Sequence, residues 1–165
     1  LRLRAGAAAD RALYRGGDPG ARLLPGARIR TIRGHAGIGA PVRAQALVAA
    51  DGFSARYDLD RVKGVFARPA HKLYGRAYVG RILVLDQAKG GVATAWMFHE
   101  MQARGMAPAA LLLNHANPVM AQGAAFGGVV LMDRFEGDVT ALIPDDALLE
   151  LEPEKGLVQI GRAHV

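Results

Sequence analysis

Three short apolar runs recur between residues 81 and 132, and they limit the folds open to this chain more than any other feature of its sequence. Residues 81–86, 109–113 and 129–132 consist mainly of Ile, Leu, Val, Ala and Met. Apolar runs of this length are typical of strands buried on both faces, as in a sheet that helices cover. We therefore predict three inner strands of one sheet.

The segments between these runs have the features of helices. Residues 92–104 place apolar side chains at helical spacing and stop at Gly105. Asn117 followed by Pro118 predicts a helix cap and first turn, and Gly127 with Gly128 predicts the helix end. Strands joined by helices through right-handed crossovers form a parallel sheet. The predicted fold class is therefore α/β, with a central, largely parallel sheet flanked by helices.

Segments on either side extend this sheet. Residues 28–33 alternate with the two-residue period of a half-buried strand, and residues 46–49 form a second short strand. Residues 148–151 and 157–158 read as a closing β-hairpin. Residues 53–65 are expected to form a polar loop.

The sequence contains no cysteine, which limits its chemistry. A disulfide framework, a thiolate zinc site, a cysteine-held cluster or a cysteine nucleophile cannot come from this chain. The longest apolar stretches, such as residues 107–113, are much shorter than the roughly 20 residues that a membrane helix needs. We expect a soluble, cytoplasmic protein with no membrane partner.

The formal net charge of +6 and the isoelectric point near 10.2 suggest a nucleic-acid binder at first sight. Residues 1–45, however, hold nine Arg and two Asp, so the rest of the chain is nearly neutral. We expect no nucleic-acid partner, and such binding stays a third alternative that rests only on the basic N-terminal segment.

Both ends of the chain differ from its middle. Residues 1–27 are rich in Ala, Gly and Arg without a steady period, and we expect a disordered or mis-started extension. Residues 160–165 read Ile-Gly-Arg-Ala-His-Val, which a common sequencing adapter would encode if translated. The folded domain is expected to span residues 28–159.

The loop after the first inner strand is the stronger candidate site. Ligands of open α/β sheets bind beyond the carboxyl ends of the strands, where helix N-termini present free N–H groups. Lys89 supplies a positive charge there, Gly90 and Gly91 allow close approach to the backbone, and Thr94 supplies a hydroxyl. The loop could bind a carboxylate or a phosphate, or it could be an ordinary strand-to-helix turn.

Other candidates carry weaker signals. Asn117 fits a helix cap better than a ligand contact, and His115 is the histidine nearest to a strand end. Ser54, the only serine, lacks the glycine-flanked elbow of a catalytic triad. No pair of residues has the spacing of a histidine–carboxylate metal motif, and His35 and His71 lie in loops without a partner that the sequence identifies.

Several pieces in a fixed order make residues 28–158 resemble the swivelling domain of the aconitase X family. The pieces are Ala46-Leu-Val48, Phe53-Ser54 through Asp60, Tyr78-Val-Gly-Arg-Ile-Leu-Val84, Lys89-Gly90, Ala107-Pro-Ala-Ala-Leu-Leu112 and Asn117-Pro-Val-Met-Ala-Gln-Gly-Ala124.

The resemblance implies a swivelling β/β/α domain, either fused or separate, that caps a larger catalytic subunit. It implies a dehydratase of hydroxy acids, such as cis-3-hydroxy-L-proline or phosphomevalonate. It also implies an iron or iron–sulfur centre held by cysteines of the large subunit, with no cofactor bound by this chain alone. Such a centre acts as a Lewis acid while a base removes a proton.

The resemblance carries over to only some residues. Ser54 and Asp60 match the family's serine and aspartate, and Lys89 with Gly90 matches its Arg-Gly, whereas Gly91 and Val92 stand where the family has serines. The missing serines leave three alternatives. The substrate differs from those of the family, the catalytic base comes from the large subunit, or Thr94 substitutes for a family serine.

The expected substrate-binding residues are Lys89, Gly90, Gly91, Arg56, Asp60 and Asn117, and the expected catalytic residues are Thr94 and Ser54. The alternative to a catalytic small subunit is a binding or regulatory module that keeps the fold without catalysis.

Overall fold

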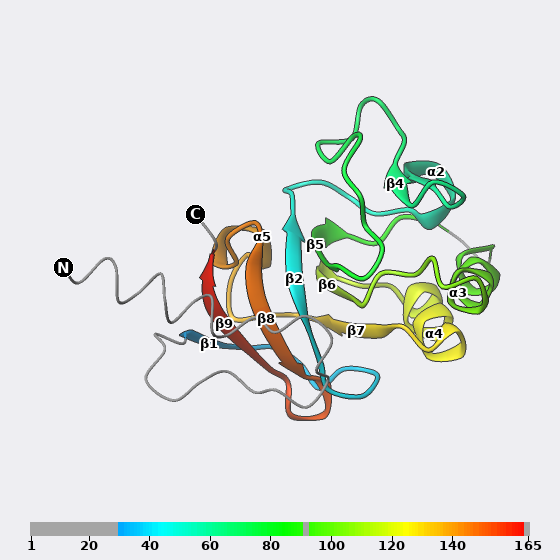
Figure 1. The fold of residues 1–165 in the computed structure, drawn as a ribbon. Helices are drawn as coiled ribbons and strands as arrows, with labels where there is room; N and C mark the ends of the chain where they lie inside the picture. The colour runs from blue at the N-terminus through cyan, green and yellow to red at the C-terminus, as the bar shows by residue number, and fades with distance from the viewer. Residues whose placement is uncertain (1–29, 91–92, 164–165) are drawn as a thin grey trace.

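The computed structural model describes residues 30–90 and 93–163 (Figure 1). Within these ranges the strands are β1 (Arg30–Arg33), β2 (Val42–Val48), β3 (Leu59–Asp60), β4 (Val65–Phe66), β5 (Ile82–Gln87), β6 (Ala110–His115), β7 (Val130–Asp133), β8 (Ala147–Glu152) and β9 (Leu157–Ala163). The helices are α2 (Ala55–Asp58), α3 (Ala93–Ala103), α4 (Pro118–Gly127) and α5 (Val139–Leu142), with a 3₁₀ turn η1 (Pro153–Lys155).

The main sheet has the strand order β1-β9-β8-β2-β5-β6-β7. Strands β2, β5, β6 and β7 are parallel, which confirms the parallel centre that the sequence predicts. Strands β8 and β9 form the predicted hairpin, and with β1 they add an antiparallel half next to β2. Strand β2 therefore belongs to both halves, and the remaining two strands, β3 and β4, form a separate small hairpin.

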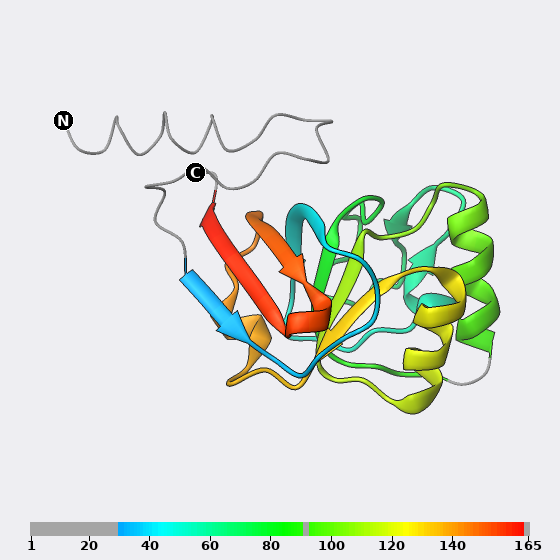
Figure 2. The same ribbon diagram turned by 90° about the horizontal axis from the view of Figure 1, so that it is seen from below.

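Side chains of the inner strands alternate between two cores. Leu83 and Leu85 belong to the core that contains side chains of α3 and α4, whereas Ile82 and Val84 belong to the core that contains α5. The helices α3 and α4 thus cover one face of the parallel half, and α5 lies on the other (Figure 2). This explains the continuous apolar runs, because both faces of these strands are buried.

The predicted polar loop over residues 53–65 is wrong in part. The structure has the short helix α2 and the β3–β4 hairpin there, and Phe53 and Phe66 are fully buried. Two-residue strands and a one-turn helix are too short to show a period in the sequence. The single turn α5 was missed for the same reason.

The two ends of the chain differ in how far the structure reaches. The N-terminal extension over residues 1–27 lies outside the described residues. The suspected tail enters strand β9, where Ile160 pairs with Arg30 and Leu149, while residues 164–165 lie outside the described part. No helix in the described ranges is long and apolar enough to span a membrane.

Candidate functional site

The carboxyl ends of β5, β6 and β7 meet at one edge of the sheet because these strands are parallel. The predicted loop at Lys89 and Gly90 follows β5, and the loop before Asn117 follows β6. The two loops contact each other, since the Ala88 N–H donates to the carbonyl oxygen of His115 at 3.1 Å. The structure thus brings both predicted loops to the edge where open α/β sheets bind ligands.

Lys89 also contacts the segment that follows β2. Its N–H donates to the carbonyl oxygen of Phe53 at 2.7 Å, and the end of its side chain lies against Gly52. Gly90 has a φ of 118°, a backbone conformation that favours glycine. Lys89 therefore lies against the segment that follows β2, and Gly90 permits the turn directly after it.

Gly91 and Thr94 are the other two predicted residues of this loop. Gly91 lies outside the described residues. Thr94 belongs to the first turn of α3, so its backbone is near the predicted place, but its side chain is outside what the structure describes. Its role as a substitute for a family serine stays a prediction.

Ser54 is buried, with only 3% of its surface exposed. Its Oγ accepts a hydrogen bond from the Tyr57 N–H at 3.3 Å, which makes it the N-cap of α2. Its own N–H donates to Oδ2 of Asp58 at 2.8 Å. In this arrangement Ser54 shapes the loop beside Lys89, and a catalytic role for it stays a prediction.

A buried polar network lies behind Ser54. Asp58, of which 1% is exposed, accepts a hydrogen bond from Nε of Arg68 at 2.6 Å. His71 accepts at Nδ1 from the Leu73 N–H at 3.0 Å, so its other nitrogen, Nε2, carries the proton and donates to the carbonyl oxygen of Gly52 at 2.8 Å. This role of His71 could not be predicted from local patterns, because its partner Gly52 lies far away along the chain.

Asp51 completes the surroundings of Lys89. Partial burial raises the pKa of this carboxyl, but the N–H groups of Lys72 and Gly52, together with the electrostatic effects of the nearby His71 ring and the Lys89 ammonium, lower it more. On balance its pKa is below the ordinary value for aspartate, so it is ionised at neutral pH.

Two other predicted residues, Arg56 and Asp60, have local partners. Arg56 is exposed and its guanidinium lies 5.3 Å from the centre of the Tyr57 ring. Asp60 accepts from the N–H groups of Lys63 and Val62 at 2.9 and 3.0 Å in the turn between β3 and β4. The Lys63 N–H lowers the pKa of this carboxyl. These contacts hold Arg56 and Asp60 on α2 and the β3–β4 turn, and no contact among the described residues joins either side chain to the loop of Lys89.

Asn117 is the N-cap of α4. Its Oδ1 accepts from the Met120 N–H at 2.7 Å, as expected for an asparagine before a proline at the first helical position. Its oxygen is therefore occupied, and a ligand would have only the amide nitrogen to bind.

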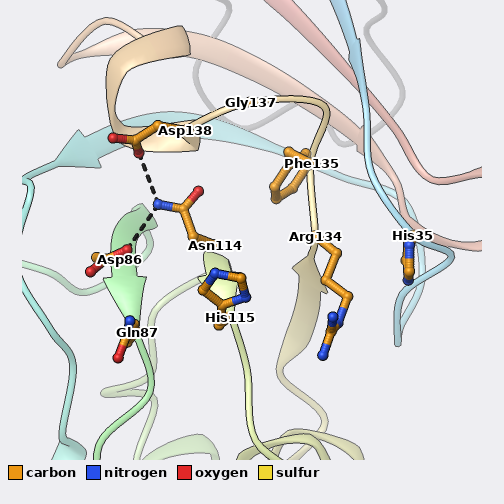
Figure 3. A pocket seen from close by; sticks show the side chains of 9 residues that line it. All are labelled: His35, Asp86, Gln87, Asn114, His115, Arg134, Phe135, Gly137 and Asp138. Carbon is orange, nitrogen blue, oxygen red and sulfur yellow. Dashed lines mark hydrogen bonds between the residues drawn. The ribbon is translucent and has the colours of Figure 1, made fainter.

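A pocket of ≈ 580 Å³ opens at the same edge, beside α5 (Figure 3). Asp86 and Asn114 are the next-to-last residues of β5 and β6. They lie on the face to which Val84 and Leu112 point, so the alternation that buries those two side chains also turns the polar pair toward α5. The lining residues are His35, Asp86, Gln87, Asn114, His115, Arg134, Phe135, Gly137 and Asp138. Sequence reasoning singled out only His115 near this place, although polar residues that directly follow buried strands were a usable signal.

Asn114 organises one side of this pocket. Its Nδ2 donates to Oδ1 of Asp138 at 2.8 Å and to Oδ1 of Asp86 at 3.0 Å, and its Oδ1 accepts from the Val139 N–H at 2.8 Å. The hydrogen bond from Asn114, followed by those from Thr140, lowers the pKa of Asp138. Asp138 is therefore ionised at neutral pH.

The described residues do not form a metal site. Their side chains contain no group of three or more His, Cys, Asp or Glu that could hold a metal ion. The whole sequence also lacks cysteine. The described part of the chain therefore does not fit an iron or iron–sulfur centre as its own group.

Comparisons with known proteins agree on one family. The family model described as the aconitase X swivel domain matches residues 31–160. The phosphomevalonate dehydratase small subunit of Methanocella arvoryzae is 28% identical over 78% of this chain and 98% of its own length. The corresponding small subunit of Methanothrix thermoacetophila is 34% identical over 62% of this chain and 75% of its own length.

A solved structure supports the fold. The holo-form of aconitase X from Thermococcus kodakaraensis superimposes with a TM-score of 0.74 at 18% identity, over 81% of this chain and 99% of that chain. At this identity the likeness concerns the fold alone, and it confirms the swivelling α/β domain that the sequence resemblance implies.

Proposed function

This chain belongs to the aconitase X swivel-domain family, and from that membership we propose that it is the small subunit of a two-chain dehydratase. In this proposal it caps the active site of a large subunit, and the complex removes water from a hydroxy acid. The observation that carries the proposal is the match over residues 31–160 together with relatives that are named dehydratase small subunits and align over nearly their full length.

The edge at Lys89 is the part of the chain that we propose to face the substrate. Its ammonium group and the backbone at Gly90 are suited to hold a carboxylate or phosphate, because Lys89 is exposed and Gly90 leaves room for an anion. Gly91, Arg56, Asp60 and Asn117 complete the proposed substrate contacts. Ser54 and Thr94 are the proposed catalytic residues, and Thr94 takes the place of the missing family serine.

The proposed reaction needs a proton to leave the carbon next to the carboxylate while the hydroxyl leaves as water. A cap that excludes water and fixes the carboxylate favours this step by orienting the substrate. The iron that the family implies is assigned to the large subunit, because the described residues of this chain do not fit it.

The substrate itself is proposed only as a hydroxy acid. The relatives from Methanocella arvoryzae and Methanothrix thermoacetophila are named as subunits of a phosphomevalonate dehydratase. The replacement of the family serines by Gly91 and Val92 leaves room for a different substrate, including cis-3-hydroxy-L-proline. The two candidates differ in charge, so an assay with both compounds separates them.

The test is co-expression of the full chain with a large subunit that contains the family cysteines. We expect a stable complex that dehydrates one of the two compounds. Lys89→Gln should raise the KM by about tenfold through the loss of a charged contact. Thr94→Val should lower kcat with a smaller effect on KM. Lys155→Gln is the matched control. Lys155 is exposed and pairs only with the neighbouring Glu152 side chain, so this change should leave KM and kcat as they are.

A non-catalytic module is the second candidate, and the Gly91 and Val92 replacements favour it. If the complex forms and Thr94→Val leaves kcat unchanged, the small chain only binds or regulates. If no complex forms with any cysteine-bearing large subunit, the main proposal is wrong.

A further inference from the structure

We propose that Asp51 is a positioning residue that holds the Lys89 ammonium group where it meets the anionic group of the substrate. Asp51 lies in the segment that follows β2, and its side chain is 18% exposed. It acts through Lys89 and does not itself touch the substrate. The inference rests on the proposed function, because it concerns the site that we propose to hold a carboxylate or phosphate.

Hydrogen bonds between the segment after β2 and the end of β5 hold the backbone of Lys89 in place. The Asp86 N–H donates to the carbonyl oxygen of Asp51 at 2.8 Å. The Phe53 N–H donates to the carbonyl oxygen of Gln87 at 2.9 Å, and the Lys89 N–H donates to that of Phe53 at 2.7 Å. These bonds continue the parallel pairing of β2 with β5. Only the side chain of Lys89 therefore still needs to be oriented.

The end of the Lys89 side chain and the Asp51 carboxylate both adjoin Gly52. A Cβ atom built on Gly52 would lie 2.9 Å from Nζ of Lys89, and the Gly52 N–H donates to Oδ1 of Asp51 at 2.8 Å. Burial raises the pKa of Asp51, whereas the N–H groups of Lys72 and Gly52 lower it, and the positive charge of Lys89 is among the further causes that lower it. The ammonium group and the carboxylate are therefore neighbours that attract each other.

The Asp51 carboxylate is itself held rigidly, so it can orient a flexible partner. Its Oδ2 accepts a hydrogen bond from the Lys72 N–H at 3.1 Å and lies 3.7 Å from Nε2 of the buried His71. The Nζ of Lys72 donates to the carbonyl oxygen of Ala50 at 2.9 Å, which fixes the same segment a second time. The carboxylate thus has a fixed place before any substrate arrives.

The charge of Asp51 has two opposite effects on the binding of an anion at Lys89. An unrestrained lysine loses rotamer freedom when it binds an anion, and a carboxylate that already restrains the ammonium group reduces this loss. The same carboxylate also repels the anion. Removing the charge therefore raises KM if positioning dominates and lowers KM if repulsion dominates. We expect positioning to dominate, because the N–H groups of Lys72 and Gly52 already offset part of the charge of Asp51.

The first test measures KM and kcat of the two-chain complex proposed above. Asp51→Asn keeps the size of the side chain and removes its charge, so we expect KM to rise about fivefold while kcat stays within about twofold. In a chain that already carries Lys89→Gln, the same change should alter KM by less than about twofold, because the lysine through which Asp51 acts is gone. An unchanged or lower KM in the single variant, or equal factors in both backgrounds, would overturn the inference.

The second test uses the full chain alone and needs no activity. The nuclear Overhauser effect between the ε protons of Lys89 and the α protons of Gly52 reports their contact in solution. We expect this NMR signal in the original chain and its loss in Asp51→Asn. Glu154→Gln, which removes a charge from the exposed turn η1, is the control and should keep both the signal and the KM. A signal that persists in Asp51→Asn would contradict the inference. A complex without dehydratase activity would refute the proposed function, and the NMR signal would still decide the role of Asp51.

Discussion

His71 shows how a single buried side chain can join two distant segments. Its ring is fully enclosed, stacks on Phe66 with the ring centres 4.7 Å apart, and uses both nitrogens for hydrogen bonds. Through Nε2 it holds the carbonyl group of Gly52, the residue against which the side chain of Lys89 lies. The position of the proposed anion-binding lysine therefore depends on a histidine that is too deep to touch a ligand.

His71→Ala should lower the free energy of unfolding by about 3 kcal/mol. The change removes the ring from a packed site and leaves the Gly52 carbonyl and the Leu73 N–H without partners. Urea unfolding followed by circular dichroism measures the loss. His99→Ala, at an exposed position of α3, is the control and should change stability by less than about 0.5 kcal/mol. Equal effects of the two variants would show that the network is not structural.

Asn114→Ala should raise the pKa of Asp138. The Asn114 amide donates to the charged form of this carboxylate and stabilises it, so removing the donor brings the pKa back toward 3.8. A lowered folded pKa stabilises the fold above the ordinary aspartate pKa, and this contribution is lost as the pH falls through the folded value. An NMR titration of the carboxyl carbons measures the shift. Asp60, whose pKa the Lys63 N–H lowers, should titrate identically in both proteins.

At the scale of secondary-structure elements, α3 and α4 lie close together where α4 ends. A Cβ atom built on Gly127 would lie 2.5 Å from Cβ of Phe98 and 2.9 Å from its backbone carbonyl carbon. Phe98 is fully buried and stacks on Phe53 with a ring-centre distance of 6.3 Å. The glycine therefore sets the distance between the two helices that cover one face of the parallel half.

Gly127→Ala should destabilise the protein by about 1–3 kcal/mol even though alanine favours helices by about 1 kcal/mol over glycine. The added methyl group pushes α4 away from Phe98 and opens the core beneath it. Thermal unfolding measures the loss. Gln122→Ala, at an exposed position of the same helix, should change stability by less than about 0.5 kcal/mol, and a Gly127→Ala protein as stable as this control would contradict the packing argument.

The elements that could be predicted from the sequence are those with a long or strongly marked local pattern. The runs that became β5, β6 and β7, and the capped helix after Asn117, are long or strongly marked enough to be read locally. The segments that became α2, β3, β4 and α5 are one turn or two residues long, and long-range contacts such as those of Asp58 and Phe66 decide them. Local patterns cannot show such contacts.

In the candidate site, too, some residues could be predicted from local patterns and others could not. The sequence placed Lys89, Gly90 and His115 near strand ends, and the structure has them at one edge. Arg134 and Asp138 come from segments farther along the chain and reach the pocket only through the crossovers of the sheet and the turn of α5. Their proximity to Asp86 is a property of the topology, which spacing along the chain does not encode.

For the molecule as a whole, Trp96 is an internal reporter for the proposed complex. It is the only tryptophan, it lies in the first half of α3 just after the loop of Lys89, and 74% of its surface is exposed. If the large subunit covers this edge, the indole loses water contacts on binding. We expect a blue shift of its fluorescence emission when the two subunits are mixed. A complex that forms without any change in emission would place the interface elsewhere.

Strand β2 is shared by the two halves of the sheet, so the chain cannot complete its sheet until both edges of β2 are paired. On one side Ala46 pairs with Ile82, and on the other Val42 pairs with Leu151 near the far end of the chain. During synthesis the parallel half can assemble while the opposite edge of β2 still waits for β8. Contacts that close so long a loop form slowly. An unpaired edge is a place where two nascent chains can associate, so we infer that aggregation competes with folding mainly until β8 leaves the ribosome.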